Sequence, residues 1–542
     1  MAQWAGNHFF LSAKIARTRM DSARPAAMGS RMHSEFDVAI VGGAFSGAAT
    51  ALLLKRRSPA LRVLIVEKSE AFDRKVGEST TEVSSCFLTR VLGLTNYLGH
   101  HQLAKQGLRM WFARTEDEPF DQCVEIGARF NARLPGFQVD RATLDEHLLS
   151  LAVAAGCELW RPAKVVKVEL GGAGSNSLEV MTGGETKHAL AKWIVDASGR
   201  AAIIARKRGY LDPMKEHPVN SLWARFTGVK DWDGSELREK FPKWADATIA
   251  ARGWATNHLC GPGWWCWIIP LKGGDVSVGL VYDERLFTAP EGATIGERIL
   301  AHCRKHPVGR EILGDAQPIE GDERAYSQLP YRVTQVMCDG WACVGDAAGF
   351  LDPLYSPGLD FCAFTAQSVA SHVADACGGK PVDVRAYNRR FAFCFQSWFD
   401  CIYRDKYYYL GDAELMAAAF LMDIAAYHLG PVKQVFSDPS TMFGKFPFDG
   451  LGGRIAAKLM SFYNRRLVAL ARKRIAAGTY GVRNAGWRLL VPGFTPEPKT
   501  SGRLLFSGIR RWLWMEIKAL WLHRKASAPP AAQPAKLPEQ IT

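Results

Sequence analysis

A glycine-rich turn that follows a short apolar strand constrains the fold of this chain more than any other feature. Residues 36–49 read FDVAIVGGAFSGAA, so a strand runs into two glycines and a helix of small residues follows. This is the βα turn of a Rossmann unit, whose helix N-terminus receives a pyrophosphate group. Gly42 permits the tight turn and Gly47 the close packing of helix on strand, while Ala44 replaces a glycine of the pattern. The predicted dinucleotide contacts are Gly42, Gly43, Ala44, Ser46 and Gly47.

A second strand supports the same fold. Residues 62–67 read RVLIVE, an apolar strand that ends in an acid twenty residues after Gly47. At this spacing a carboxylate accepts hydrogen bonds from ribose hydroxyls, so Glu67 is predicted to hold the adenosine ribose. The chain carries one such fingerprint, and a second, nicotinamide-binding Rossmann domain is therefore not expected.

Three later segments follow in an order that matches a known family. Residues 193–200 (WIVDASGR) and 341–349 (WACVGDAAG) are strands that close on a turn, and residues 138–145 read QVDRATLD. Together with the first motifs, they resemble the large FAD-binding family that includes the aromatic hydroxylases and the flavin-dependent halogenases. The resemblance implies that Asp346 holds the ribityl and pyrophosphate part of FAD and that Arg141 lies near the flavin.

A tryptophan-rich segment resembles one branch of this family. Residues 265–270 read WCWIIP, similar to the WxWxIP signature of the tryptophan-halogenase-like enzymes. Alternate residues of a strand share a face, so Trp265 and Trp267 are predicted to form a rigid wall of the substrate pocket. Such a wall would keep the substrate away from the flavin and hinder direct hydroxylation. The alternative is that both indoles are ordinary core residues of a β-strand.

A glycine–glutamate turn and a later lysine resemble the same branch. Residues 76–80 read VGEST, and Lys105 lies in the segment AKQGLRMWF. The resemblance implies that Lys105 is the catalytic residue, which receives hypohalous acid and directs it to the substrate. In that mechanism FAD, reduced by a separate reductase, reacts with O₂ to a hydroperoxide that a halide ion attacks. Lysine suits the role because its ammonium donates hydrogen bonds and burial lowers its pKa.

The loop at residues 350–360, FLDPLYSPGLD, resembles the family's halide-binding loop. The resemblance implies that the Ser356 hydroxyl and the Gly358 N–H hold a halide ion, with Gly358 and Leu359 also against the flavin. Pro357 stands where the family offers a further N–H group, which proline lacks.

Tyr355 in the same loop bears on the substrate. It is predicted to line the substrate pocket, and it replaces the glutamate of tryptophan-specific halogenases. We therefore expect an FAD-dependent halogenase that acts on an electron-rich aromatic substrate, which is phenolic, pyrrolic or bound to a carrier protein. The alternative is an FAD-dependent monooxygenase or dehydrogenase without a halide step, docked to a membrane or a carrier protein.

The positive charge of the chain is confined to its C-terminal region. The formal net charge is +14; residues 451–490 contain nine Lys or Arg and no acid, and residues 503–525 contain six against Glu516. A region of this kind suits an anionic membrane surface or an acidic acyl carrier protein, contacted through residues 451–525. Nucleic acid binding is not expected. The expected location is the cytoplasm, with peripheral attachment to the inner face of the membrane as an option.

Residues 503–525 are predicted to form an amphipathic helix. One side carries bases and two tryptophans, namely Arg503, Arg510, Arg511, Trp514, Lys518, Trp521 and Lys525. The other side is apolar apart from Glu516, and it comprises Leu504, Leu505, Ile509, Trp512, Leu513, Leu520 and Leu522. The alternative is a helix that packs on the domain and leaves its charged face to solvent.

The predicted fold class is α/β, with a Rossmann-type FAD-binding domain, a mixed-sheet substrate domain and a helical C-terminal extension. A metal site is not expected, because the twelve cysteines form no CxxC pair. The expected division is a disordered extension (1–33), the FAD-binding domain (34–210 and 325–375), the substrate-side sheet (211–324), a helical cap (376–500), the basic amphipathic helix (501–525) and a disordered tail (526–542).

Overall fold

The computed structural model describes residues 33–172, 174–492 and 497–526. The side chains of residues 521–526 are outside the described set. The extension predicted at 1–33 and the tail predicted at 526–542 therefore lie, apart from one residue each, outside the described residues.

The first sheet is the Rossmann-type core. Its parallel strands lie in the order β20, β10, β1, β2, β7, and α1 (Phe45–Arg57) and α10 (Gly358–Cys377) pack against it. The central residues of β1 are fully buried, as expected for a parallel strand covered on both faces. The α/β fold class is confirmed. The strands are β1 (His33–Val41), β2 (Val63–Val66), β7 (Glu158–Trp160), β10 (Glu185–Asp196) and β20 (Trp341–Cys343).

The second sheet is mixed, with the strand order β16, β12, β15, β14, β13, β4, β5, β22. The pairs β13–β4 and β5–β22 are parallel, and the other neighbours are antiparallel. The strands are β4 (Leu108–Phe112), β5 (Val124–Ala128), β12 (Val219–Thr227), β13 (Thr256–Gly261), β14 (Trp264–Pro270), β15 (Val276–Asp283), β16 (Gln317–Pro318) and β22 (Arg488–Val491).

The strand pairing assigns three strands to the second sheet that lie outside the range expected for it, 211–324. Strands β4 and β5 fall inside 34–210, yet they extend the second sheet. Strand β22 falls inside the range 376–500 and closes the edge of the same sheet through β5. The physical reason is that backbone hydrogen bonds, rather than proximity in sequence, assign a strand to a sheet.

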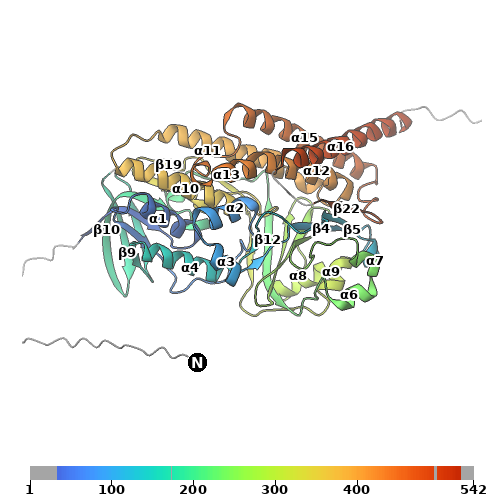
Figure 1. The fold of residues 1–542 in the computed structure, drawn as a ribbon, viewed down its shortest axis with the longest axis horizontal. Helices are drawn as coiled ribbons and strands as arrows, with labels where there is room; N and C mark the ends of the chain where they lie inside the picture. The colour runs from blue at the N-terminus through green and yellow to red at the C-terminus, as the bar shows by residue number, and fades with distance from the viewer. Residues whose placement is uncertain (1–32, 173, 493–496, 527–542) are drawn as a thin grey trace, which may run out of the picture.

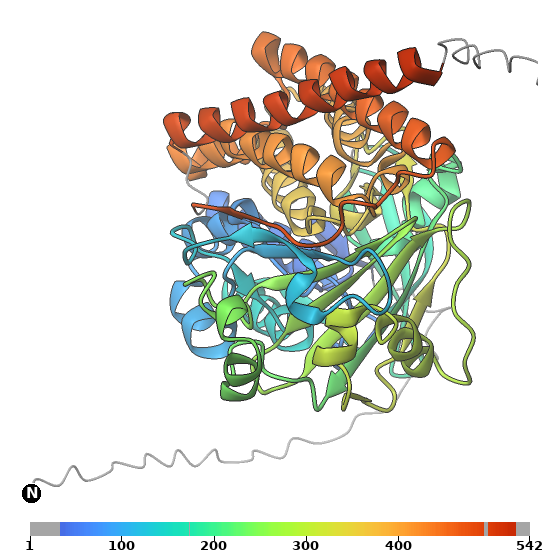
Figure 2. The same ribbon diagram turned by 90° about the vertical axis from the view of Figure 1, so that its right-hand side faces the viewer.

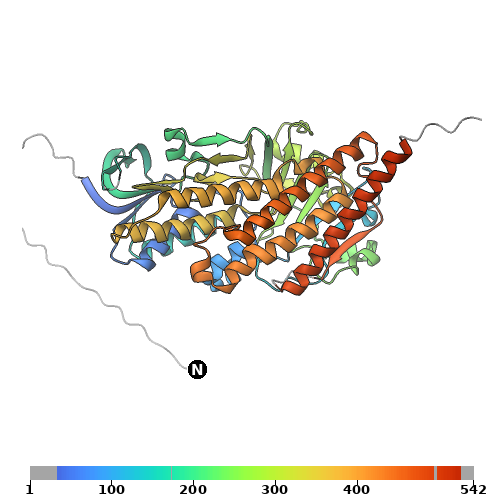
Figure 3. The same ribbon diagram turned by 90° about the horizontal axis from the view of Figure 1, so that it is seen from above.

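Helices from the C-terminal part form a layer over both sheets (Figures 1 and 2). Seen from above, α15 and α16 lie on the outer side of this layer (Figure 3). The run 413–437 has the length and apolar composition of a membrane span, but 72% of its apolar window is buried inside the protein, as in a core helix. The main helices are α11 (Val384–Trp398), α12 (Ala413–Tyr427), α15 (Gly450–Ala476) and α16 (Pro498–Ala526).

Helix α16 spans the predicted amphipathic segment, but its inner and outer sides differ from the expected ones. It packs on α12 and α15. Leu513 and Leu520 are exposed instead of packed. Glu516 faces the protein, where its carboxylate accepts hydrogen bonds at 2.7 and 2.9 Å from Arg466 of α15. The side of α16 that faces the protein carries Leu504 and Met515, which are buried. It is this side because α12 and α15 pack against it.

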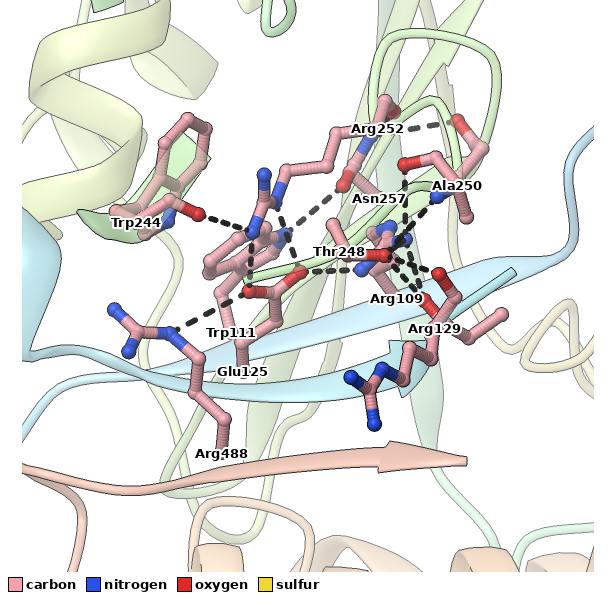
Figure 4. Close-up of polar contacts among 12 residues, drawn as sticks. Arg109, Trp111, Glu125, Arg129, Trp244, Thr248, Ala250, Arg252, Asn257 and Arg488 are labelled. Atoms are coloured by element: carbon pink, nitrogen blue, oxygen red, sulfur yellow. Dashed lines mark hydrogen bonds and ion pairs between the residues drawn. The ribbon is translucent and has the colours of Figure 1, made fainter. Parts of the chain in front are cut away.

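A buried carboxylate joins three strands of the second sheet (Figure 4). Glu125 of β5 forms ion pairs with Arg109 of β4, with Arg252 at 3.0 Å, and with Arg488 of β22 at 3.7 Å. Burial alone would raise the pKa of Glu125, but the charges of Arg109 and Arg252 outweigh this effect and hold the pKa below its ordinary value. The cluster therefore fixes the C-terminal strand β22 to the sheet.

We expect Glu125→Gln to lower the free energy of unfolding by about 3–5 kcal/mol, because it leaves two buried guanidinium groups without their counter-charge. Urea unfolding followed by circular dichroism measures the loss. The matched control is Glu236→Gln, which removes an exposed ion pair with Lys230 and should cost less than about 1 kcal/mol. Equal losses in the two variants would contradict this role of Glu125.

Candidate active site

The geometry of the first turn matches the roles predicted for its glycines. Gly42 has a φ of +103°, and a Cβ there would stand 2.5 Å from the carbonyl oxygen of Ala197. A Cβ on Gly47 would overlap the Gly42 carbonyl oxygen, so only glycine allows this approach of helix and turn. Ala44 is the N-cap of α1 with an ordinary φ of −71°, which explains why a methyl group is tolerated there.

Glu67 stands at the end of β2 beside this turn. It is 5% exposed, and its carboxylate accepts hydrogen bonds from the Gly43 N–H at 2.7 Å and the Ser69 N–H at 2.8 Å. These bonds fix both oxygens, while their remaining lone pairs are available to a ligand. Glu67 also lines the cavity described next, and its ribose contact stays a prediction.

A cavity of about 750 Å³ runs from the carboxyl ends of β1, β2 and β10 to β14 of the second sheet. It offers a carboxylate at one end, the open N-terminus of α1, and indoles at the other end, which fits an elongated dinucleotide such as FAD. Gly43 and Gly47 lie behind its wall. The predicted cofactor residues that line it are Gly42, Ala44, Ser46, Glu67, Arg141, Asp346, Gly358 and Leu359.

Two charged residues of this cavity influence each other. Burial raises the pKa of Asp346, and the charges of Arg141 and Arg200 oppose the shift. Arg141 is held by Asp145 at 3.1 Å, in α4 (Arg141–Ala154), and Lys75 binds the same carboxylate at 2.6 Å. Arg141 therefore has a fixed position beside the cavity.

We call the cavity of about 750 Å³ the flavin cavity, and both predicted tryptophans line it. Trp265 donates a hydrogen bond to the Tyr407 hydroxyl at 3.0 Å, and Trp267 donates one to the Ser277 hydroxyl at 3.0 Å. Their rings lie 5.8 Å apart. The Tyr407 hydroxyl in turn donates to the buried Asp352 at 3.0 Å. The indoles are thus fixed in place and line the flavin side, whereas the prediction placed them in the substrate pocket.

A second cavity of about 870 Å³ lies on the other side of the segment 78–82. Glu78 and Ser79 line the first cavity, whereas Thr80, Thr81 and Glu82 line the second, and Pro357 lines both. This segment is therefore the wall between the two cavities. Arg225 anchors it with two hydrogen bonds to the buried Glu78 carboxylate, at 2.5 and 3.0 Å.

Lys105 lies at this wall. Its ammonium donates hydrogen bonds to the Ser79 hydroxyl at 2.8 Å and to the Thr80 carbonyl oxygen at 2.7 Å, and it lines the second cavity. The side chain is buried, and burial lowers its pKa to about 8, against the opposing charges of Glu82 and Asp360. The predicted catalytic lysine is thus placed between the two cavities.

A carboxyl that the sequence analysis did not assign lines the second cavity as well. Asp360 accepts hydrogen bonds from the Thr81 hydroxyl at 2.5 Å, the Ser84 N–H at 3.0 Å and the Tyr427 hydroxyl at 3.0 Å. Burial raises its pKa to about 7, although these hydrogen bonds lower it. Its position as the last residue of the segment 350–360, which resembles the halide loop, is the signal that could have identified it.

Tyr355, which is predicted to line the substrate pocket, lies at the second cavity. The buried ammonium of Lys406 lies 5.1 Å from its ring and pairs with Asp423 at 2.8 Å. Tyr355 and Ser356 both have positive φ angles, 69° and 60°, a strained pair for residues that carry a Cβ. This strain accompanies a sharp turn of the loop between the two cavities.

The predicted halide residues lie at the N-terminus of α10. The Ser356 N–H already donates to the Pro353 carbonyl oxygen at 2.9 Å. Pro357 is the N-cap, so the N–H groups of Gly358 and Leu359 begin the helix and have no acceptor within it. The space beside Gly358 is open, since nothing lies within 4 Å of where a Cβ would stand.

Comparisons with known proteins identify the family. The sequence pattern of the family described as tryptophan halogenase matches residues 37–122 and 127–409. A flavin-dependent halogenase of Dictyostelium discoideum is 25% identical over 460 residues, which cover 76% of this chain and 74% of that protein. A 1H-pyrrole-2-carbonyl-peptidyl-carrier-protein chlorinase of Pseudomonas fluorescens is 25% identical over 361 residues, covering 63% of this chain and 76% of that protein.

The fold is also that of a solved halogenase. The crystal structure of halogenase PltM in complex with phloroglucinol and FAD matches with a TM-score of 0.70 at 16% identity, over 89% of this chain and 96% of that chain. Because the family pattern covers more than half of the chain, the chain belongs to the tryptophan halogenase family and is an FAD-dependent oxidoreductase of the halogenase type.

Proposed function

We propose that the enzyme transfers an electrophilic halogen to an electron-rich aromatic ring held in the second cavity, with Lys105 as the catalytic residue. The observation that carries the proposal is the place of Lys105, whose ammonium is buried at the wall between the flavin cavity and the second cavity. A direct hydroxylation would need the ring beside the flavin, whereas here the segment 78–82 separates the two spaces.

The flavin cavity supplies the oxidant. Bound FAD, reduced by a separate reductase, provides the chemistry that turns O₂ and a halide ion into hypohalous acid. Glu67, Asp346 and Arg141 would hold the cofactor, and the free N–H groups of Gly358 and Leu359 at the start of α10 would hold the halide, since a helix N-terminus favours an anion.

Lys105 receives the oxidant at the wall. Its ammonium has three N–H donors, and Ser79 and Thr80 accept two of them. The third N–H can donate to the oxygen of hypohalous acid and present the halogen to the ring. This role requires the ammonium form, so it is lost as the pH rises through the pKa of Lys105, about 8.

Asp360 can accept the proton that the aromatic ring or its hydroxyl releases. It lines the same cavity as Lys105, and its pKa of about 7 lies close to neutral pH, where a carboxyl is most effective as a general base. As a carboxylate it would also attract the Lys105 ammonium. Phenolic, pyrrolic and carrier-bound rings all suit this arrangement, and the chlorinase relative is named for a carrier-bound pyrrole.

One observation favours the second candidate, an FAD-dependent monooxygenase or dehydrogenase without a halide step. Pro357 supplies no N–H group to the halide loop. In either case the basic region 451–525 would bind the partner, for which an anionic membrane or an acidic carrier protein are the candidates. The expected location is the cytoplasm, including the inner face of the membrane.

We expect Glu67→Gln to weaken FAD binding roughly tenfold or more, because it removes a charge-assisted acceptor worth ~1.5–3 kcal/mol. Fluorescence titration of the apoprotein with FAD measures the change. The control is Glu70→Gln, an exposed neighbour that does not line the cavity. Unchanged affinity in the Glu67 variant would contradict the placement of the ribose.

We expect Lys105→Met to lower the rate of halogenated product by at least about 10²-fold, which corresponds to about 2.7 kcal/mol, while FAD stays bound. Methionine keeps the length of the side chain and loses its N–H donors. Product is measured by mass spectrometry with bromide and a panel of phenols and pyrroles. Lys243→Met, at an exposed position, is the control. A Lys105 variant that halogenates at the wild-type rate, or a wild type that only hydroxylates, would overturn the proposal.

We expect kcat/KM for halogenation to fall on both sides of neutral pH. It decreases below about 7, where Asp360 is protonated, and above about 8, where Lys105 loses its proton. Asp360→Asn should lower the rate and remove the acidic limb while leaving the alkaline limb in place. The melting temperature and FAD content of the variant control for folding. An acidic limb that persists unchanged would exclude Asp360 as the base.

A further inference from the structure

The outer layer of helices exposes two apolar stripes. On α15, Leu451, Ile455, Leu459 and Phe462 recur at intervals of three or four residues and so lie along one side of the helix. Their exposed fractions are between 48% and 77%. Side chains of this kind, gathered on one side of a helix, mark a surface that meets a partner.

Helix α16 adds the second stripe. Phe506, Leu513, Ile517 and Leu520 follow at intervals of seven, four and three residues and so also lie along one side of the helix. Trp514 lies next to them, and all five are between 47% and 71% exposed. The two helices meet where the Phe462 and Trp512 rings contact each other at 6.3 Å. We call the exposed side chains of α15 and α16 the outer face; Figure 3 shows both helices from that side.

Basic side chains surround these stripes. Lys458 and Arg465 of α15, and Arg503, Arg510 and Lys518 of α16, are exposed, and within the described residues none of them forms an ion pair with a carboxylate. Residues 451–490 contain no acid, and Glu516, the acid of α16 among residues 503–525, is occupied by Arg466. The outer face therefore combines apolar side chains with positive charge that is not paired with a carboxylate in the described part of the chain.

The second cavity opens beside the same face. Its inner end is lined by Lys105 and Asp360, and its outer end by Leu459 and Phe462 of α15 and Ile509 of α16. Leu459 and Phe462 are thus at once rim residues of the cavity and members of the apolar stripe. A ligand that enters from this side passes over an apolar, basic surface before it reaches Lys105.

We propose that the outer face binds an anionic membrane surface and that the aromatic substrate is a lipophilic molecule taken from the bilayer. Apolar stripes that lie in the plane of two helices and are flanked by Lys and Arg match the interfacial mode, with the bases at the headgroups and Phe, Leu and Trp below them. An acidic carrier protein would satisfy the bases but would leave the stripes on both helices uncovered.

Sedimentation of the full-length holoenzyme with phosphatidylglycerol vesicles, and with phosphatidylcholine vesicles, tests the surface. We expect binding to the anionic vesicles that weakens with salt. Arg510→Glu/Lys518→Glu should reduce it by at least about tenfold, because each cation near an anionic surface raises partitioning about fivefold. The control, Lys243→Glu/Lys305→Glu, reverses exposed charges near α7 (Pro242–Ala245) and α8 (Ile295–Cys303), on the far side of the molecule (Figure 1).

Phe506→Ser/Ile517→Ser tests the apolar part, since both side chains are exposed and neither lines the cavity. This variant should also lose binding to the anionic vesicles. Equal binding of the wild type, the Arg510→Glu/Lys518→Glu variant and the Phe506→Ser/Ile517→Ser variant would overturn the membrane surface. So would a wild type that ignores vesicles and binds an acidic acyl carrier protein instead.

The substrate half of the inference rests on the proposed halogenation. With pentadecylphenol in anionic vesicles, Phe506→Ser/Ile517→Ser should halogenate at least about tenfold more slowly than wild type, while both halogenate phenol in solution equally. Equal loss on both substrates would overturn delivery from the bilayer. If the wild type halogenates neither substrate, the proposed function and this delivery fail together, while vesicle binding still decides the membrane surface.

Discussion

The hydrogen bonds of the buried Lys105 ammonium are the interaction on which the architecture of the site depends. A buried positive charge is costly unless it is paired or hydrogen-bonded, and here the Ser79 hydroxyl and the Thr80 carbonyl oxygen meet that need. Both acceptors belong to the segment that separates the two cavities. The same contacts that make the lysine tolerable in the interior therefore hold the wall in place, while burial lowers the pKa of Lys105 toward neutral pH.

The path of the chain places Lys105 at the wall between the two cavities. Lys105 lies between β3 (Leu103–Ala104), which pairs with β6 (Phe137–Gln138), and β4, which belongs to the second sheet. Its N–H donates to the Gly136 carbonyl oxygen at 2.8 Å, which fixes the backbone at this crossing. The residue is thus placed where the chain leaves the Rossmann half and enters the other sheet, which is also where the two cavities adjoin.

Charge is divided between the enzyme body and its outer helices. In the body, charged groups are paired in the interior, as in the Glu125 cluster with Arg109 and Arg252 that ties β22 to the sheet (Figure 4). On α15 and α16, several bases instead face solvent beside exposed apolar side chains. Unpaired surface charge adds little to the free energy of folding. Its concentration on one face therefore suits the binding of a negatively charged partner.

The sequence by itself determined the Rossmann turn, the halogenase family and its FAD cofactor, because these features depend on local spacing and on backbone angles that only certain residues adopt. Only the tertiary structure decided which cavity the indoles of Trp265 and Trp267 face, that β4 and β22 complete the second sheet, and that Asp360 lies with Lys105 in one cavity. It also decided which side of α16 is exposed. The reason is that burial and strand pairing arise from contacts between segments far apart in sequence, which periodicity within one segment does not specify.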